Sequence, residues 1–435
     1  MKKYLPLVIV EVYLIATLAL LYIGPIYFKI HNQLTFITLL FLYHGFFIAG
    51  YIISTAKAKK KVGSLVEKEL SNSFFYLSFS LGIIGIFGSY RNLMLSTSFI
   101  PYDFFDNLVL GLTEPGLVYT ERMIKVDSGV TSDSRLFNIV SIFFSFFKLL
   151  FIFEAVYFWS TIGRLKKLLF VAYSLLFISS GISSGTNSVI FIYFIFLAIS
   201  ISVVLYISNY IYIRRVLTIS AVLFLIPVAS FGYIMSQRGG GFEYFTSTSP
   251  LGDITPPLTS PDLDNASLFD FFYYSIVWID YYLVQGYYGF SLILNLDHNW
   301  TFGFGNSPFL QNQFKILFGA DLSEFTFQHR ISSLWDESAQ WHSFYGLFAN
   351  DFGLIGVAFF MFFLGYYFAR IWISVIYENS FYAAALMPVF ALMFIFIPAN
   401  NIVFGFIDTL SYFIFVSILF LIEDKKMRLI GYVRK

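Results

Sequence analysis

The chain has 435 residues, of which 58% are hydrophobic and only 12% charged, and its mean hydropathy is +0.75. Soluble domains carry about 25% charged residues, so this composition excludes an ordinary soluble protein and indicates a polytopic membrane protein. The formal net charge of +1 gives no reason to expect nucleic-acid binding, and the absence of cysteine excludes disulfides, thiolate metal sites and a cysteine nucleophile.

Ten stretches are long and apolar enough to cross a bilayer, which takes about 20 residues. In chain order they are 4–24, 33–53, 74–94, 137–160, 168–183, 188–209, 216–235, 351–372, 381–398 and 403–422. The first follows Met-Lys-Lys, as a signal peptide would. It lacks a small-x-small cleavage site and contains Glu11, so we expect a retained span.

Lysine and arginine gather in alternate short connections and at both ends of the chain. Because short basic loops stay in the cytoplasm, we predict cytoplasmic termini and two outer loops, 95–136 and 236–350. Within the second loop, 268–296 is too aromatic for a free loop, while Asp270 and Asp280 oppose a lipid-facing span. We expect interfacial or re-entrant helices there. The predicted fold is all-α: a single transmembrane helical bundle over 1–435 with about 10–12 spans.

The large outer loop has an unusual inventory of side chains. Between 236 and 348 it holds eleven acidic residues, three basic residues, three of the five histidines and four of the six tryptophans. Aromatic rings beside carboxylates suit a sugar, and Trp335, Asp336 and Trp341 are the candidate substrate-binding residues. The alternative is that these rings hold the loop against the membrane surface.

Three arginines are candidates for a phosphate-binding role. Arg238 is followed by three glycines, and its planar fork suits a lipid-linked pyrophosphate; lipid headgroups are the alternative ligand. Arg330 lies beside His329, a candidate substrate-binding residue, and the alternative for Arg330 is a salt bridge with the acidic pair at 336–337. Arg91, near the outer end of the third span, is the third candidate.

The segment that leads into the eighth span carries the main candidate for chemistry. If a helix begins at its start, five residues share one face: His342, Gly346, Ala349, Gly353 and Gly356. The small residues then form a groove for a lipid tail or another helix. A histidine at its mouth suits proton transfer near neutral pH, and Tyr345, a candidate substrate-binding residue, could orient the imidazole or the acceptor. Alternatively, the groove is a packing seam and His342 is a capping group.

No motif predicts a metal or a cofactor. The sequence has no His-Glu-x-x-His spacing, no paired-acid motif after an outer span end, no P-loop and no dinucleotide fingerprint. A reaction outside the cell then has to draw its energy from an activated substrate such as a lipid-pyrophosphate sugar.

The pattern Trp-His-Ser-x-Tyr…Asn-Asp-Phe-Gly-x-Ile-Gly over 341–356, after a long outer loop, resembles the O-antigen polymerase (Wzy-type) family. The resemblance implies a fold like the type C glycosyltransferases in the bacterial inner membrane, with a periplasmic active site and large periplasmic loop. The substrates would be undecaprenyl-pyrophosphate-linked oligosaccharides among membrane lipids, and the partner a chain-length-regulating co-polymerase. His342 would act as the base, while Arg238 and Arg330 stabilise pyrophosphate.

Three other functions remain open. An O-antigen ligase would use the same donor and a different acceptor. A lipid-linked oligosaccharide flippase or another transporter would have more spans and shorter loops. A non-enzymatic scaffold would tolerate replacement of Arg238 and His342.

Overall fold

A computed structural model describes residues 2–57, 71–96, 101–127, 142–208, 241–258 and 267–433, together with isolated positions from 218 to 235. The chain divides into two compact units. The first comprises Met1–Lys61, Gly240–Tyr377 and Leu392–Phe406. The second comprises Val62–Gly239, Glu378–Ala391 and Ile407–Lys435.

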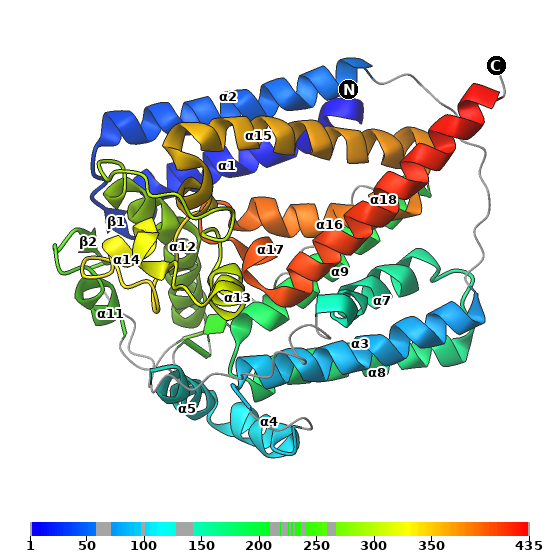
Figure 1. Cartoon of the computed structure of the whole chain (residues 1–435). Helices are drawn as coiled ribbons and strands as arrows, with labels where there is room; N and C mark the ends of the chain where they lie inside the picture. The colour runs from blue at the N-terminus through cyan, green and yellow to red at the C-terminus, as the bar shows by residue number, and fades with distance from the viewer. Residues whose placement is uncertain are drawn as a thin grey trace. The chain divides into compact units, whose positions relative to one another are not determined.

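The all-α, polytopic character predicted from the sequence is confirmed (Figure 1). Six helices of the described part are long and apolar enough to cross a membrane. They are Lys2–Ile23, Gln33–Lys57, Asn72–Leu93, Arg164–Ser183, Asn187–Ile207 and Phe344–Glu378. They match the first, second, third, fifth, sixth and eighth predicted spans. Most of the seventh, 216–235, lies outside the described residues.

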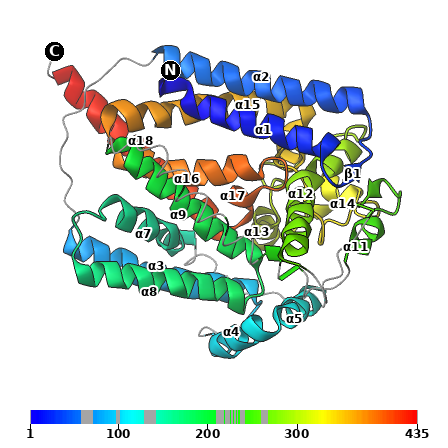
Figure 2. The same ribbon diagram turned by 180° about the vertical axis from the view of Figure 1, so that it is seen from behind.

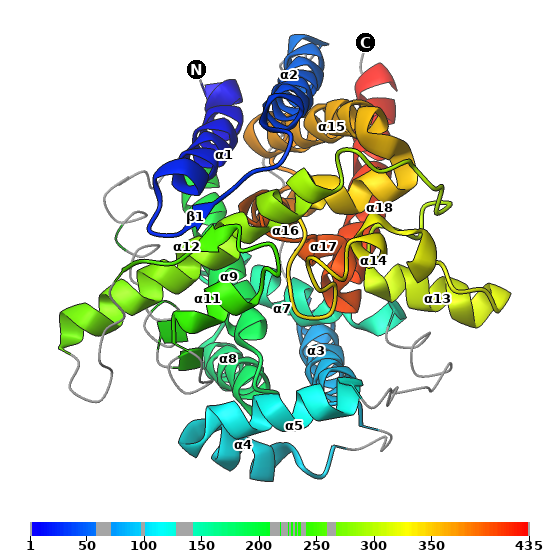
Figure 3. The same cartoon turned by 90° about the vertical axis from the view of Figure 1, so that its left-hand side faces the viewer.

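The first unit contains the described part of the outer loop predicted over 236–350. Its elements are η1 (Lys2–Tyr4), α1 (Leu5–Ile23), β1 (Tyr27–Phe28), α2 (Gln33–Lys57), α11 (Glu243–Ser247), β2 (Ile254–Thr255), α12 (Leu268–Leu292), α13 (Pro308–Phe318), η2 (Ser323–Phe325), α14 (Phe327–Arg330), α15 (Phe344–Glu378) and α17 (Ile402–Gly405). The two short strands pair antiparallel, with Tyr27 opposite Thr255. The expected re-entrant or interfacial segment is one 25-residue helix, α12, which crosses the direction of α1 and α2 (Figures 1 and 3).

Local sequence sets the ends of the loop helices. At the start of α12, Ser267 and Asp270 form a capping box. Ser307 caps α13 and Pro308 occupies its first turn. These caps satisfy N–H groups that a helix start otherwise leaves without partners.

The long helix α15 packs closely against α2. A Cβ at Gly50 would lie 2.0 Å from the carbonyl oxygen of Phe362, and one at Gly365 would lie 2.2 Å from that of Phe47. Small residues at such crossings let helix backbones approach within the bilayer, where apolar burial gives no net advantage over lipid. The two glycines therefore set the spacing of α2 and α15.

The second unit consists of α3 (Asn72–Leu93), α4 (Phe104–Thr113), α5 (Pro115–Asp127), α7 (Phe146–Tyr157), α8 (Arg164–Ser183), α9 (Asn187–Ile207), the first part of α16 (Phe381–Phe396) and α18 (Ile407–Val433). Helix α3 contacts both α7 and α8 (Figure 2). The predicted outer loop 95–136 contains two helices, α4 and α5, in its described part.

A buried ion pair stabilises the second unit. Lys148 on α7 lies 2.7 Å from Asp408 on α18 and 3.0 Å from the hydroxyl of Ser89 on α3. The Lys148 side chain is 4% exposed. Ionisable groups within spans are costly unless they are paired, and Asp408 supplies the partner that Lys148 requires.

Candidate functional site

Helix α12 supports the segment that carries the predicted catalytic histidine. The Tyr281 hydroxyl donates to Gln340 at 2.7 Å, and the backbone N–H of Trp341 donates to the Gln285 side chain at 3.0 Å. The N–H of Ser343 donates to the carbonyl of Gly286 at 3.2 Å. Residues 340–343 therefore lie along one face of α12 in an extended conformation.

His342 is buried against α12. A Cβ at Gly289 would lie 3.1 Å from His342 Nδ1 and 3.0 Å from the indole nitrogen of Trp335. His342 is 5% exposed, and its Nε2 has no hydrogen-bond partner among the described residues. Burial lowers the pKa of His342 to about 3. The imidazole is therefore neutral at physiological pH and a weak proton acceptor.

The predicted groove of small residues is not continuous. Helix α15 begins at Phe344, after His342, and Gly353 has φ 68° and ψ 166°, which breaks the helix. A Cβ at Gly346 would meet Ile293 and Phe290, while one at Gly353 would meet the ring of His298. The even helical spacing assumed from the sequence is wrong here because the positive φ at Gly353 turns the chain.

Tyr345 contacts a different histidine from the one expected. Its hydroxyl lies 3.3 Å from His44 Nε2, and His44 Nδ1 lies 2.7 Å from a carboxylate oxygen of Glu11. These three residues come from α15, α2 and α1, so Tyr345 belongs to a polar chain within the spans.

Trp335 and Trp341 hold the segment together. The Trp335 side chain is fully buried, donates to the carbonyl of Trp341 at 3.0 Å and packs edge-on against Tyr288. The ring of Trp341 packs against Tyr282 at 4.8 Å between centroids. Trp335 thus fixes the turn before His342, whereas Trp341 is only half-buried.

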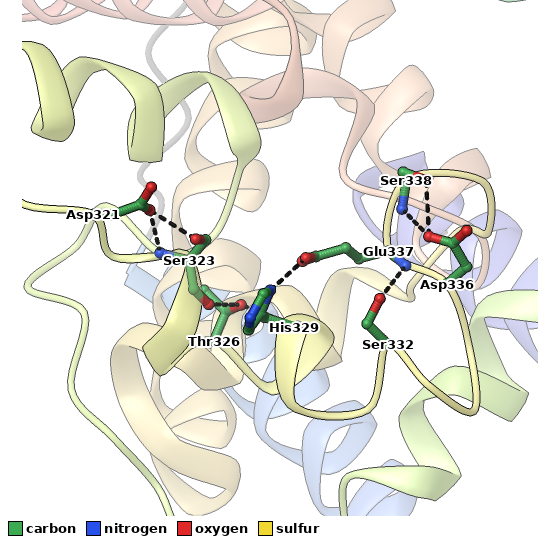
Figure 4. A network of polar contacts seen from close by, with 8 residues as sticks. All are labelled: Asp321, Ser323, Thr326, His329, Ser332, Asp336, Glu337 and Ser338. Atoms are coloured by element: carbon green, nitrogen blue, oxygen red, sulfur yellow. Dashed lines mark hydrogen bonds and ion pairs between the residues drawn. The ribbon is translucent and has the colours of Figure 1, made fainter. Parts of the chain in front are cut away.

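His329 lies in a more accessible polar network (Figure 4). Its Nδ1 is 2.6 Å from a carboxylate oxygen of Glu337, and the two side chains are 45% and 32% exposed. Thr326 accepts from the N–H of His329 and so caps the short helix α14. Asp336 accepts from both the N–H and the hydroxyl of Ser338. A carboxylate that orients an exposed imidazole is the usual arrangement of a catalytic or binding histidine.

Arg330 does not form the salt bridge considered from the sequence. One of its nitrogens donates to the carbonyl of Asp297, and its guanidinium lies 5.8 Å from the centroid of the Phe327 ring. The described residues place no carboxylate in ion-pair contact with it, because Glu337 pairs with His329. Its positive charge is therefore available to an anion.

The other two candidate arginines are not among the described residues of the first unit. Arg91 is buried on α3 in the second unit, at 3% exposure. Arg238 lies outside the described residues.

The structure also brings Asn350 and Asp351 of the quoted pattern into contact with loop residues that the sequence did not single out. Asp351 accepts from the Thr301 hydroxyl at 2.5 Å, from the N–H groups of Gly303 and Gly305 at 2.9 and 3.0 Å, and from the Asn306 amide at 2.9 Å. The neighbouring Asn350 accepts from the N–H of Phe327 at 2.8 Å and donates to the carbonyl of Gly305 at 2.9 Å. This clamp fixes two parts of the loop to the N-terminal end of α15.

A second overlooked pair joins the α1–α2 connection to the loop. His31 Nε2 lies 2.6 Å from Asp253, which is buried and also 3.3 Å from Lys29. Burial of Asp253 acts to raise its pKa, but the hydrogen bonds from His31 and Lys29 outweigh burial and hold the pKa below its usual range. The partners are 222 positions apart, so no local sequence signal could have revealed them.

Comparison of the chain with protein-family models, with curated proteins and with solved structures finds no match.

Proposed function

We propose that this protein polymerises lipid-linked oligosaccharide repeat units on the outer face of the bacterial inner membrane. In this reaction a hydroxyl of the incoming unit attacks the anomeric carbon of the growing glycan. The bond from that carbon to undecaprenyl pyrophosphate breaks, the hydroxyl proton passes to a base, and the pyrophosphate leaves with the electron pair. The site therefore needs one proton acceptor and at least one fixed cation.

The observation that carries the proposal is the carboxylate-paired His329 next to Arg330. Because a carboxylate only accepts hydrogen bonds, Glu337 holds the Nδ1–H of the neutral ring and leaves Nε2 to take a proton. Arg330, whose charge no described carboxylate neutralises, supplies the donor for a pyrophosphate oxygen. Geometry thus favours His329 over the buried His342 as the proton acceptor.

His342 has a separate role in the proposal. Its buried Nε2 has no hydrogen-bond partner among the described residues, and we assign it a hydroxyl of the bound sugar. The imidazole lies beside Trp335 and α12; in this proposal His342 orients substrate, whereas His329 carries the proton.

The test is complementation of a strain that lacks the protein, with the surface glycan separated by length on a gel. His329→Ala and Arg330→Ala abolish the ladder on this proposal. Lys315→Ala removes an exposed lysine of the same loop and is the matched control, which keeps the ladder. Loss of the ladder in His342→Ala alone would assign the base to His342. Normal ladders from all three site variants would refute the proposal.

The acceptor distinguishes a polymerase from the ligase alternative. A polymerase extends a lipid-linked unit in purified membranes without any lipid A-core, whereas a ligase needs that acceptor. Addition of purified lipid-linked repeat units to the reconstituted protein therefore separates the two.

One observation favours a transporter as a second candidate function. Glu11, His44 and Tyr345 form a polar chain within the spans, and such chains mark proton pathways in membrane transporters. In that case Glu11→Gln stops transport, and the lipid-linked unit accumulates on the cytoplasmic face. Outer-face accumulation in the strain lacking the protein would support the polymerase.

A further inference from the structure

Two aromatic side chains of the large loop project from the molecule in parallel. Trp300 and Phe302 are 66% and 65% exposed, and their rings stack at 6.0 Å between centroids with 10° between the planes. Phe304, two residues after Phe302, packs against Phe318 at the end of α13 with 6.4 Å between ring centroids, and Leu317 and Phe318 are 68% and 64% exposed. Large apolar side chains gathered in this way on a surface mark a place where something else covers them.

These rings are held in place by buried contacts beneath them. Thr301, between the two aromatic residues, is fully buried and donates to Asp351. Phe302 and Gly303 both have positive φ, at 56° and 86°, and the N–H of Gly303 also donates to Asp351. The turn is thus fixed from inside, and the outward direction of the two rings follows from it.

The turn is fixed to Asp351, which lies near the N-terminal end of the span α15. Asp351 comes two residues before Gly353, beyond which α15 continues as an apolar helix. Three large side chains along that helix are exposed: Ile355 at 61%, Phe359 at 56% and Phe363 at 67%. Such residues face lipid in a membrane-spanning helix. The clamped turn is therefore anchored where this lipid-facing surface ends.

Helix α13 has the polarity of a helix lying at a membrane surface. It crosses the direction of α1, α2 and α15 in two views (Figures 1 and 3). Leu317 and Lys315 lie two residues apart, on nearly opposite sides of a helix with 3.6 residues per turn. Lys315 is 60% exposed and pairs with Asp321 at 2.8 Å. One side of the helix is thus apolar and the other charged.

We infer that the turn at 300–303 and the end of α13 form an anchor that inserts into the headgroup region of the outer leaflet. Tryptophan is favoured at this depth, and tryptophan, phenylalanine and leucine form the apolar face of interfacial helices. A soluble sugar fits it less well, because the Thr301 hydroxyl and the Asn306 amide beside the rings already donate to Asp351. This anchor is independent of the proposed polymerase activity.

The first test uses spin labels in the full chain reconstituted into phosphatidylcholine nanodiscs. Since the protein has no cysteine, Leu317→Cys and Lys315→Cys each introduce a unique thiol at positions of similar exposure. The anchor predicts that the label at 317 collides with oxygen several-fold more than with a water-soluble nickel chelate, and that this ratio reverses at 315. Equal ratios at both positions would overturn the inference.

The second test uses tryptophan fluorescence with lipids brominated near the headgroup. Replacing Trp300 by Phe removes a quenchable component of the emission, and the double variant Trp300→Phe/Phe302→Trp restores it. Trp335→Phe, which removes a fully buried ring, leaves the quenchable component unchanged. A Trp300 component that brominated lipid does not quench, but that soluble oligosaccharide shifts, would make the surface a sugar platform and refute the anchor.

Discussion

Removal of the Asp351 carboxylate tests the clamp at the N-terminal end of α15. In Asp351→Ala, four donors lose their acceptor, and three of them belong to the buried residues Thr301, Gly305 and Asn306. Hydrogen bonds to charged groups contribute about 1.5–3 kcal/mol each. Since the exposed Gly303 can bond to water instead, we expect the loop to lose roughly 3–5 kcal/mol of local stability. Asp351→Asn keeps an acceptor oxygen and loses about 1–2 kcal/mol.

Hydrogen–deuterium exchange of the reconstituted protein measures this loss directly. A loss of 3 kcal/mol raises the population of the open loop by about 100-fold, so the amides of 301–306 exchange faster by that factor in Asp351→Ala and by a smaller one in Asp351→Asn. Asp321→Ala, which removes an exposed carboxylate from the same loop, is the control and leaves 301–306 protected. Wild-type protection of 301–306 in Asp351→Ala would refute the clamp.

Three further predictions concern packing and buried charge. Gly286→Ala places a Cβ 2.4 Å from the carbonyl oxygen of Pro398 and should lower the unfolding free energy by about 3 kcal/mol, which is measured as a lower melting temperature of the detergent-solubilised protein. Gly45→Ala is the control. Because a Cβ there would meet nothing within 4 Å, its melting temperature should be unchanged or raised. Burial raises the pKa of Asp280 to about 7, so the folded state loses stability as pH rises from the unfolded pKa of about 4 towards 7. Asp280→Asn should have a higher melting temperature than wild type at pH 8 and the same melting temperature at pH 4. The same melting temperature as wild type at both pH values would contradict this. Lys148→Met or Asp408→Leu alone leaves a buried charge and should cost about 3–5 kcal/mol, while the double variant should recover most of it; additive losses would show that the pair is not coupled.

Several features of the fold follow directly from the sequence. Apolar stretches of about 20 residues have to form helices in a bilayer, because lipid offers no partner for an open backbone N–H or carbonyl. Six of the ten predicted spans accordingly appear as long apolar helices among the described residues. The start of α12 can also be predicted from the sequence, since Ser267 and Asp270 have the spacing of a capping box.

The candidate site was only partly predictable. His329 and Arg330 attract notice in the sequence as a histidine and a cation in an acidic loop, but the partner of His329 is decided by the turn at 332–338. His342 was expected on a helix face, yet the helix begins two residues later and the imidazole is buried against α12. A shift of two residues in a helix start was enough to change its surroundings.

The sequence by itself determined that this is a polytopic helical membrane protein, because hydropathy acts through the local composition of each span. Only the tertiary structure decided which charges meet. Asp253 pairs with His31 across 222 positions and Lys148 with Asp408 across 260. These distances along the chain carry no periodic signal, and the pairs form because each buried charge requires an opposite one that chain folding brings within reach.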